Sequence, residues 1–346
     1  MHLISLEGEV HSKLRRVSQK VLANQVQERI CLISFRHAIR LREKLILKQA
    51  PFSITDIDRI LRSVALDIIS EAIFGTSWNS LDGIDEQKAN ALSTIMETLH
   101  WRINDLGDRS WRNRPFRPSK VLETYCLQEI RNPMPESMLF EWMKYDLSDD
   151  ELQNLCMTFL TMGHENISTA MSWLLLQLAQ NPDIQNQARK QVIESGIFKS
   201  TTPPANLKMK LNSLSVLSDS FLEASRLYPS VAVLSRMNPK ETQVCGFTIP
   251  AYQQLVVSIY DLNRDSSQWG DDAHIFNPGR KCEAWTFGGG PRSCVGKPLS
   301  FIESPIVIAS ILSEFQVRAE KVLPQNMVSF RPGKHELEFV QSAAKL

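Results

Sequence analysis

The sequence lacks the features that identify a metal-cluster protein or a nucleic-acid-binding protein. No CxxC pair occurs, so no zinc or iron–sulfur framework is visible. The six cysteines are widely scattered: Cys31, Cys126, Cys156, Cys245, Cys282 and Cys294. Such thin use of cysteine fits a reducing compartment, where most thiols are expected to be buried and inert. The formal net charge of +1 gives no sign of nucleic-acid binding.

Long hydrophobic runs are also missing. The apolar stretch within residues 1–10 is too short for a signal peptide or a spanning helix, so the chain as it stands carries no membrane anchor. With 43% hydrophobic and 22% charged residues, the composition is that of an ordinary globular protein and excludes a disordered or collagen-like chain. The sequence shows neither internal repeats nor βαβ alternation, which favours one mainly helical domain over its 346 residues.

Apolar residues at helical spacing predict the main helices. The clearest follows Ser148, which forms a capping box with Glu151, and it extends about thirty residues, or ~45 Å, to Gln180. Further helical segments are expected over residues 9–48, 55–75, 214–228 and 299–315. Short strands are expected at 243–249 and 255–259, and a hairpin that turns at Pro332-Gly333 is expected within 327–340. The predicted fold class is therefore mainly α with small β-sheets.

The most informative segment is the glycine-rich loop from Phe287 to Gly296, which precedes a helix. It delivers Cys294 to the start of that helix, where free backbone N–H groups and the helix dipole stabilise a thiolate. Gly290 and Gly296 leave room for a flat, bulky group, and Arg292 is suited to a carboxylate. One thiolate, a carboxylate partner and a glycine-lined surface together indicate a haem ligated by cysteine.

Two other interpretations of this loop are weaker. A phosphate-binding loop requires GxxxxGK[ST] or GxGxxG, and neither is present. A reactive-thiol loop would usually supply a base near the cysteine, and this requirement weakens the second interpretation. The loop resembles the haem-binding pattern FxxGxRxCxG of the cytochrome P450 family at every specified position. The resemblance implies that Cys294 is the axial thiolate, that Arg292 pairs with a haem propionate and that Phe287 packs over the sulfur.

A second motif lies upstream, where Glu223 and Arg226 form an E-x-x-R pattern before Pro229. Alone, such a pair is typical of a solvated helix surface. In this order along the chain it resembles the family's K helix. The resemblance implies a buried structural triad of Glu223, Arg226 and Arg280 that holds the haem loop. The similar segment 263–273 gives no indication of catalysis.

Three further cationic residues match family positions for haem propionates. Arg236 has the expected spacing after Pro229, and residues 230–234 before it are expected to face the substrate. His11 and Arg15 belong to an HxxxRR pattern and share one helix face. The alternatives are a solvated arginine and an ordinary basic helix face.

The long helix partly resembles the family's oxygen-binding groove, [AG]Gx[DE]T[TS]. Gly163 and Glu165 match, but Asn166 stands where the oxygen-activating threonine belongs, and Glu165 and Asn166 are the candidate catalytic residues. Because each helical residue turns by about 100°, Ser168 points some 200° away and does not replace that threonine. Thr169 is closer in angle but lies one turn further on. Since asparagine is a poorer proton relay, we expect monooxygenation to be slow or uncoupled.

The resemblance extends from about residue 8 to the end and is weakest over 82–145. It implies a single, incomplete haem-thiolate catalytic domain over residues 1–346, truncated before the family's first strands and early helices. The implied activity is oxidation or hydroxylation of an apolar small molecule with O₂ and electrons from an NADPH-dependent flavin reductase. Arg16, Lys20 and Lys297 are expected to meet this acidic partner.

The resemblance also carries expectations about the type of organism, the cellular location and alternative functions. The long helix and residues 261–278 resemble filamentous-fungal members, many of which act in secondary metabolism. The family implies the cytosolic face of the endoplasmic reticulum, reached through an anchor that this chain lacks. Two alternatives remain open: a haem-thiolate isomerase or dehydratase that needs no external electrons, and a non-catalytic remnant that binds no haem.

Overall fold

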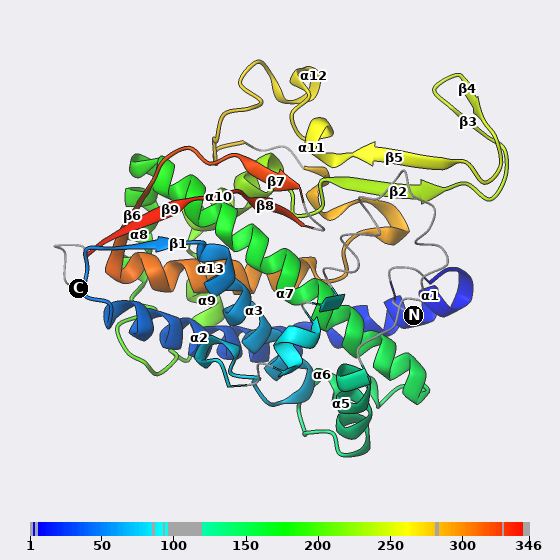
Figure 1. Cartoon of the computed structure of the whole chain (residues 1–346), viewed down its shortest axis with the longest axis horizontal. Coiled ribbons are helices and arrows are strands. Elements are labelled where there is room, and N and C mark those ends of the chain that lie inside the picture. The colour runs from blue at the N-terminus through cyan, green and yellow to red at the C-terminus, as the bar shows by residue number, and fades with distance from the viewer. Residues whose placement is uncertain are drawn as a thin grey trace.

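The longest helix, α7 (Asp149–Gln180), crosses the whole molecule, and the other long helices surround it (Figure 1). This computed structural model describes residues 3, 6–84, 87–92, 94–95, 120–280, 284–326 and 329–341. Helix α3 (Ile57–Phe74) packs along α7, and α13 (Lys297–Glu314) packs along α2 (Asn24–Ile46). The hydrophobic core lies where these four helices meet.

The predicted boundaries of α7 and α3 are confirmed because local side chains set them, whereas the segment expected over 9–48 divides into two helices, over 8–21 and 24–46. Ser148 accepts a hydrogen bond from the Glu151 N–H at 3.2 Å, and the Glu151 carboxylate accepts one from the Ser148 N–H at 2.9 Å. This capping box starts α7. Gly75 ends α3 with a φ of +81°, a left-handed conformation that glycine adopts at little cost.

Residues 87–92 and 94–95 are helical, and shorter helices with defined bounds lie elsewhere in the described chain. They are α1 (Gly8–Val21), α5 (Lys120–Arg131), α6 (Met138–Trp142), α8 (Pro182–Ser195), α9 (Leu207–Asn212), α10 (Ser215–Leu227), α11 (Ile259–Leu262) and α12 (Ser266–Trp269). Among the described residues, 3₁₀ turns are found at η2 (Ser80–Asp82), η4 (Trp285–Phe287) and η5 (Gly290–Arg292). In the described part of the chain, we find no helix that combines the length and hydropathy needed to cross a membrane.

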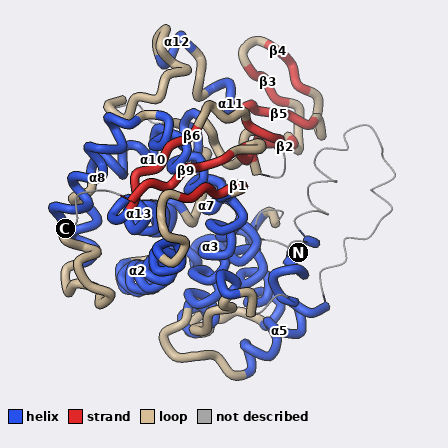
Figure 2. Tube along the Cα trace, turned by 60° about the vertical axis from the view of Figure 1, so that its left-hand side comes forward, coloured by secondary structure: helices blue, strands red, loops and turns tan. Residues whose placement is uncertain are grey.

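In the described part of the chain, the strands form four small antiparallel sheets, and the strands labelled in Figure 2 lie above α2, α3 and α5. One sheet has the order β1 (Phe52–Thr55), β9 (Glu336–Gln341) and β6 (Phe315–Ala319). The pairs are β2 (Val233–Met237) with β5 (Gln254–Ser258), β3 (Thr242–Val244) with β4 (Phe247–Ile249), and β7 (Pro324–Asn326) with β8 (Phe330–Pro332). The predicted fold class, mainly α with small sheets, is therefore confirmed.

Two strand predictions are wrong in detail. Residues 243–249 form part of a hairpin, because Cys245 and Gly246 have φ values of +48° and +83° and turn the chain. The expected hairpin at Pro332-Gly333 does not form. Strand β8 pairs with β7, and β9 pairs with β1 and β6. The Gly333 N–H donates to the Leu323 carbonyl at 2.8 Å, which directs β8 back along β7.

The cysteines also differ from expectation in part. Cys31, Cys126 and Cys156 are buried, as the sequence predicts, whereas Cys245 and Cys294 are exposed. Cys282 lies outside the described residues. Cys245 occupies the β3–β4 turn, where exposure follows from the hairpin. Cys294 requires a different explanation.

Candidate active site

Cys294 lies in the turn that leads into α13. Its backbone N–H donates to the Phe287 carbonyl at 2.8 Å, which closes the loop containing η5. The thiol is exposed to solvent, yet the surrounding protein raises its pKa. The N–H groups of Gly296 and Lys297 and the charge of Arg15 act in the opposite direction. The expected delivery of one cysteine to a helix start is therefore observed.

The two glycines around Cys294 leave space, as expected. Gly290 has a φ of +63°, and a Cβ there would meet nothing within 4 Å. A Cβ on Gly296 would lie 3.9 Å from the Cys294 sulfur. The centroids of the Phe287 and Phe301 rings are 5.8 Å apart. Lys297 Nζ lies 5.5 Å from the centroid of the Phe287 ring. Packing of Phe287 over the sulfur stays a prediction.

Three of the four predicted propionate donors gather beside this loop. Arg15 donates to the Ser293 carbonyl at 2.7 Å and to its hydroxyl at 3.0 Å. Arg292 donates to the Leu6 carbonyl at 2.8 Å. Burial lowers the pKa of the His11 imidazole, and the charges of Arg292 and Arg15 lower it further. Arg236 is on β2, is exposed, and donates to the neighbouring Ser235 carbonyl at 2.8 Å.

Helix α7 is buried along most of its length but open at one point. Of residues 155–179, all of which the structure describes, every residue is buried except Met162, Gly163 and Asn166. These residues are at positions i, i+1 and i+4 and so share one face of the helix. The candidate residue Asn166 therefore lies on the one accessible face of this segment.

Gly163 has a packing role that the sequence did not reveal. A Cβ at this position would lie 2.9 Å from Cγ1 of Ile69 on α3. Glycine here lets α3 approach α7 closely, so the match to the family's groove has a helix-packing cause in this chain.

Asn166 is held on both its backbone and its side chain. The Ser230 hydroxyl donates to the Asn166 carbonyl at 2.8 Å, and the Ser329 hydroxyl donates to Oδ1 at 3.3 Å. The nearby hydroxyls do not face the same way. Ser168 and Thr169 are buried, and both donate to the Glu165 carbonyl at 3.0 Å. Neither hydroxyl takes the place of the missing threonine.

Glu165 belongs to a buried charge cluster between α3, α7 and β8. Its carboxylate is paired with Arg331 and lies 3.9 Å from Arg62 and 3.8 Å from His164. Asp58 is paired with Arg62 and lies 3.8 Å from Arg331. Burial alone would raise the pKa of Glu165, but the cationic partners, Arg331 above all, hold it below its ordinary value. Glu165 is therefore ionised, and its catalytic role stays a prediction.

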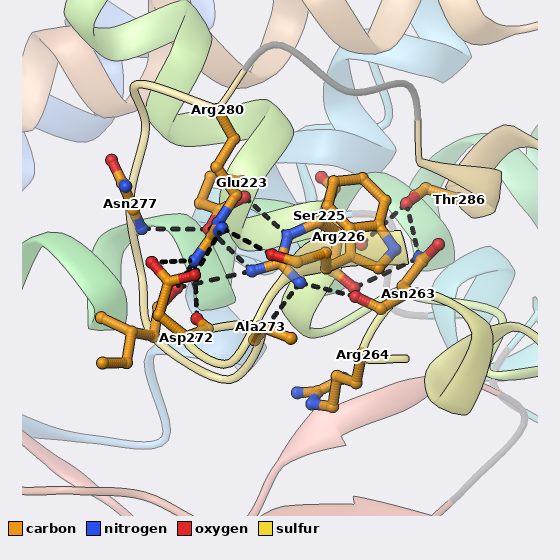
Figure 3. Close-up of polar contacts among 12 residues, drawn as sticks. Glu223, Ser225, Arg226, Asn263, Arg264, Asp272, Ala273, Asn277, Arg280 and Thr286 are labelled. Atoms are coloured by element: carbon orange, nitrogen blue, oxygen red, sulfur yellow. Dashed lines mark hydrogen bonds and ion pairs between the residues drawn. The ribbon is translucent and has the colours of Figure 1, made fainter. Parts of the chain in front are cut away.

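The three residues of the predicted triad are in contact (Figure 3). Arg226 donates to both Glu223 oxygens, at 2.7 and 2.8 Å, and Arg280 donates to Glu223 at 3.2 Å. Asp272, which the sequence did not single out, pairs with Arg280 at 2.8 Å. Arg226 also donates to the Ala273 carbonyl at 2.7 Å. The segment 263–273 thus completes the triad's hydrogen bonding.

Arg331, Asn263 and Asp272 are residues at the site whose roles sequence reasoning missed. Arg331 is an isolated arginine on a short strand, and nothing in its neighbourhood in sequence points to Glu165. Asn263 had a signal, because it opens the Asn-Arg-Asp segment that resembles the family. That segment indicates a structural role for Asn263, but the residues that Asn263 hydrogen-bonds can be identified only from the fold.

Comparison with known proteins identifies the family of the chain. The family model described as "Cytochrome P450" matches residues 134–339, more than half of the chain. Cytochrome P450 72A397 of Kalopanax septemlobus is 26% identical over 358 residues, which cover 90% of this chain and 66% of the relative. Cytochrome P450 72A68 of Medicago truncatula is 26% identical over 377 residues, covering 95% and 71%.

A third relative is more similar over a shorter stretch. Cytochrome P450 CYP72A219 of Panax ginseng is 31% identical over 310 residues, which cover 79% of this chain and 59% of the relative. The chain thus spans between 59% and 71% of the length of these three relatives. All three come from plants, so the predicted likeness to filamentous-fungal members is not supported. The match over residues 134–339 shows that the chain belongs to the cytochrome P450 family, whose members hold haem through a cysteine thiolate.

Proposed function

We propose that this chain is the catalytic part of a haem-thiolate monooxygenase that oxidises an apolar small molecule. The observation that carries the proposal is the setting of Cys294. Its thiol is exposed at the start of a helix, beside two backbone N–H groups and the cations Arg15 and Lys297. These N–H groups and cations oppose the raising of the Cys294 pKa by burial, and the exposed sulfur is accessible to a metal.

The residues present fit a haem in three respects. The sulfur is accessible, the space beside Gly290 is open, and α7 exposes one face at Asn166. We assign His11, Arg15, Arg292 and Arg236 to the propionates, since the three arginines are cationic and an imidazole donates an N–H in either protonation state. Arg15 and Arg292 now donate to carbonyl oxygens, so each already presents donor groups beside the loop.

When bound, haem supplies activation of O₂, and electron donation from the thiolate favours cleavage of the O–O bond. The protein's own part is to hold the reactants and to manage protons. Asn166 is placed to hydrogen-bond O₂ or a water on the open face of α7. Glu165, the preceding residue, is an ionised carboxylate within the buried cluster, and we assign it to proton transfer toward that face.

The partners and setting follow from the same proposal. The electrons come from an NADPH-dependent flavin reductase, and the exposed cations Arg16, Lys20 and Lys297 are suited to meet its acidic surface. Residues 1–346 act as one catalytic domain. We place the protein in secondary metabolism, at the cytosolic face of the endoplasmic reticulum. The substrate is specified here only as apolar and small.

Asn166 also favours a second function. Because the Ser168 and Thr169 hydroxyls are buried and bonded to the Glu165 carbonyl, no alcohol from these positions reaches the open face. A haem-thiolate isomerase or dehydratase needs no delivered proton of this kind and no external electrons. Turnover in the absence of NADPH and reductase would favour that function over monooxygenation.

The test is a carbon monoxide difference spectrum of the reduced, haem-reconstituted chain, recorded beside Cys294→Ala. We expect a strongly red-shifted Soret band in the natural chain and its loss in the variant. Cys245→Ala is the matched control, because Cys245 is the other exposed cysteine among the described residues. A band typical of a non-thiolate ligand, or no haem uptake by a folded chain, would overturn the proposal and favour a non-catalytic remnant.

A further inference from the structure

We propose that Asn263 is a positioning residue that transmits the geometry of the Glu223–Arg226 pair to the loop of Cys294. This inference rests on the proposed function, because it assigns a role in shaping the thiolate site. Asn263 follows α11 and is completely buried. Its side chain lies between helix α10 and the 3₁₀ turn η4 (Figure 3).

Every hydrogen-bonding group of the Asn263 side chain is used. Nδ2 donates to the Arg226 carbonyl at 3.2 Å and to the Thr286 hydroxyl at 3.2 Å. Oδ1 accepts the Trp285 N–H at 2.9 Å. A primary amide offers two donor hydrogens and one acceptor oxygen, so no simpler side chain makes the same three bonds.

Further bonds close this connection on both sides. Arg226 donates to the Asn263 carbonyl at 2.5 Å, which fixes the backbone of Asn263 to the triad. The Thr286 hydroxyl donates to the Ser225 carbonyl at 2.9 Å, which ties η4 to α10 a second time. The arrangement therefore links the helix of the E-x-x-R motif to η4 at two consecutive residues.

Turn η4 leads directly to the cysteine. Its last residue, Phe287, accepts the Cys294 N–H at 2.8 Å. A shift of η4 consequently moves the acceptor that orients the Cys294 backbone. Because the bonds of Asn263 are buried, losing them leaves unpaired polar groups and makes another loop conformation competitive.

The experiment compares Asn263→Ala and Thr286→Val with two controls. Thr286→Ser keeps the hydroxyl. Asn238→Ala removes another amide, whose Nδ2 donates to the carbonyls of Lys240 and Pro250 at 2.9 and 2.8 Å in the β2–β5 connection. The first readout is the ratio of the thiolate to the non-thiolate band of the reduced, carbon monoxide-bound protein. The second is hydrogen exchange of residues 284–296 in the haem-free chain.

We expect Asn263→Ala and Thr286→Val to lower the band ratio and to speed exchange in this segment by about fivefold or more. Thr286→Ser and Asn238→Ala should match the natural chain. Unchanged exchange and an unchanged band ratio in Thr286→Val would overturn the inference even if Asn263→Ala fails to fold. A natural chain without a thiolate band overturns the proposed function instead, while exchange still decides whether Asn263 positions the loop.

Discussion

Arg331 on β8 and Glu165 in the middle of α7 form a buried ion pair between residues 166 positions apart in the chain. The pair joins a small hairpin near the C-terminus to the central helix, one residue before Asn166. Both side chains are mostly buried, at 15% and 2% exposure, so water does little to screen their interaction.

Removing the positive partner should be costly. We expect Arg331→Met to lower the free energy of unfolding by about 3–5 kcal/mol, because it leaves the Glu165 charge buried with weaker partners. Adding Glu165→Gln should recover most of this loss, since the charge is then gone. Urea denaturation of the two single variants and the double variant measures the coupling.

Arg318 offers a matched control for this pair. It lies on β6, is 66% exposed and is 3.6 Å from Glu338. Arg318→Met should change the free energy of unfolding by no more than about 1 kcal/mol, as is usual for exposed pairs. Equal effects of Arg331→Met and Arg318→Met would show that the buried pair contributes no more to stability than the exposed pair.

The buried carboxyl of Glu303 on α13 should make the free energy of unfolding depend on pH. It is completely buried, both carboxylate oxygens lack a hydrogen-bond partner among the described residues, and burial raises its pKa to about 8 from 4.5. Between these values the folded state keeps a proton that the unfolded chain loses, so stability falls as pH rises. The full decrease in the free energy of unfolding across this interval is roughly 5 kcal/mol.

The measurement is the free energy of unfolding across this pH interval for the natural chain and for Glu303→Gln. The natural chain should lose stability relative to the variant as pH rises, because the amide does not ionise. Glu194→Gln is the control, since Glu194 is 63% exposed and 3.9 Å from Lys190. Parallel curves for the natural chain and Glu303→Gln would refute the prediction.

Several features of the fold and of the candidate site are set by residues that lie close together in the sequence. The capping box of Ser148 and Glu151 and the stop at Gly75 involve residues a few positions apart, and both were predicted. The loop around Cys294 follows a dense pattern of glycines and was also found. Pairing of β8 with β7, and the bonds of Arg331 and Asn263, join distant segments that no short pattern records. A turn was expected at Gly333, although its strand partners were not, and the turn at Gly246 was read as part of a strand.

Gly163 should resist substitution although it lies inside a helix. Glycine to alanine in a helix normally stabilises by about 1 kcal/mol. Here we expect Gly163→Ala to destabilise by about 1–3 kcal/mol, because the new Cβ would lie 2.9 Å from Ile69. Thermal unfolding of Gly163→Ala, Ile69→Ala and the double variant tests this. The double variant should be less damaged than the sum of the single ones, and a more stable Gly163→Ala would contradict the packing role.

Asn166→Thr should improve the coupling of electron use to product. The Ser230 bond is made to the backbone carbonyl and survives the change, while the new hydroxyl lies on the open face of α7. A positioned proton donor adds up to about 10²–10⁴-fold in rate, so we expect a severalfold rise in product formed per NADPH. Thr169→Val is the control, since its hydroxyl is buried against the Glu165 carbonyl. Unchanged coupling in Asn166→Thr would argue for the electron-independent function.

The bond from Arg15 to Ser293 constrains when the site forms during synthesis. The two residues are 278 positions apart, so α1 leaves the ribosome long before the loop that it helps to shape. At roughly 5–20 residues per second, the delay is about 14–56 s. Throughout that interval Arg15 has no Ser293 to bind. The cysteine-bearing loop is therefore among the last parts of the chain to be assembled, and cofactor loading belongs to the end of folding.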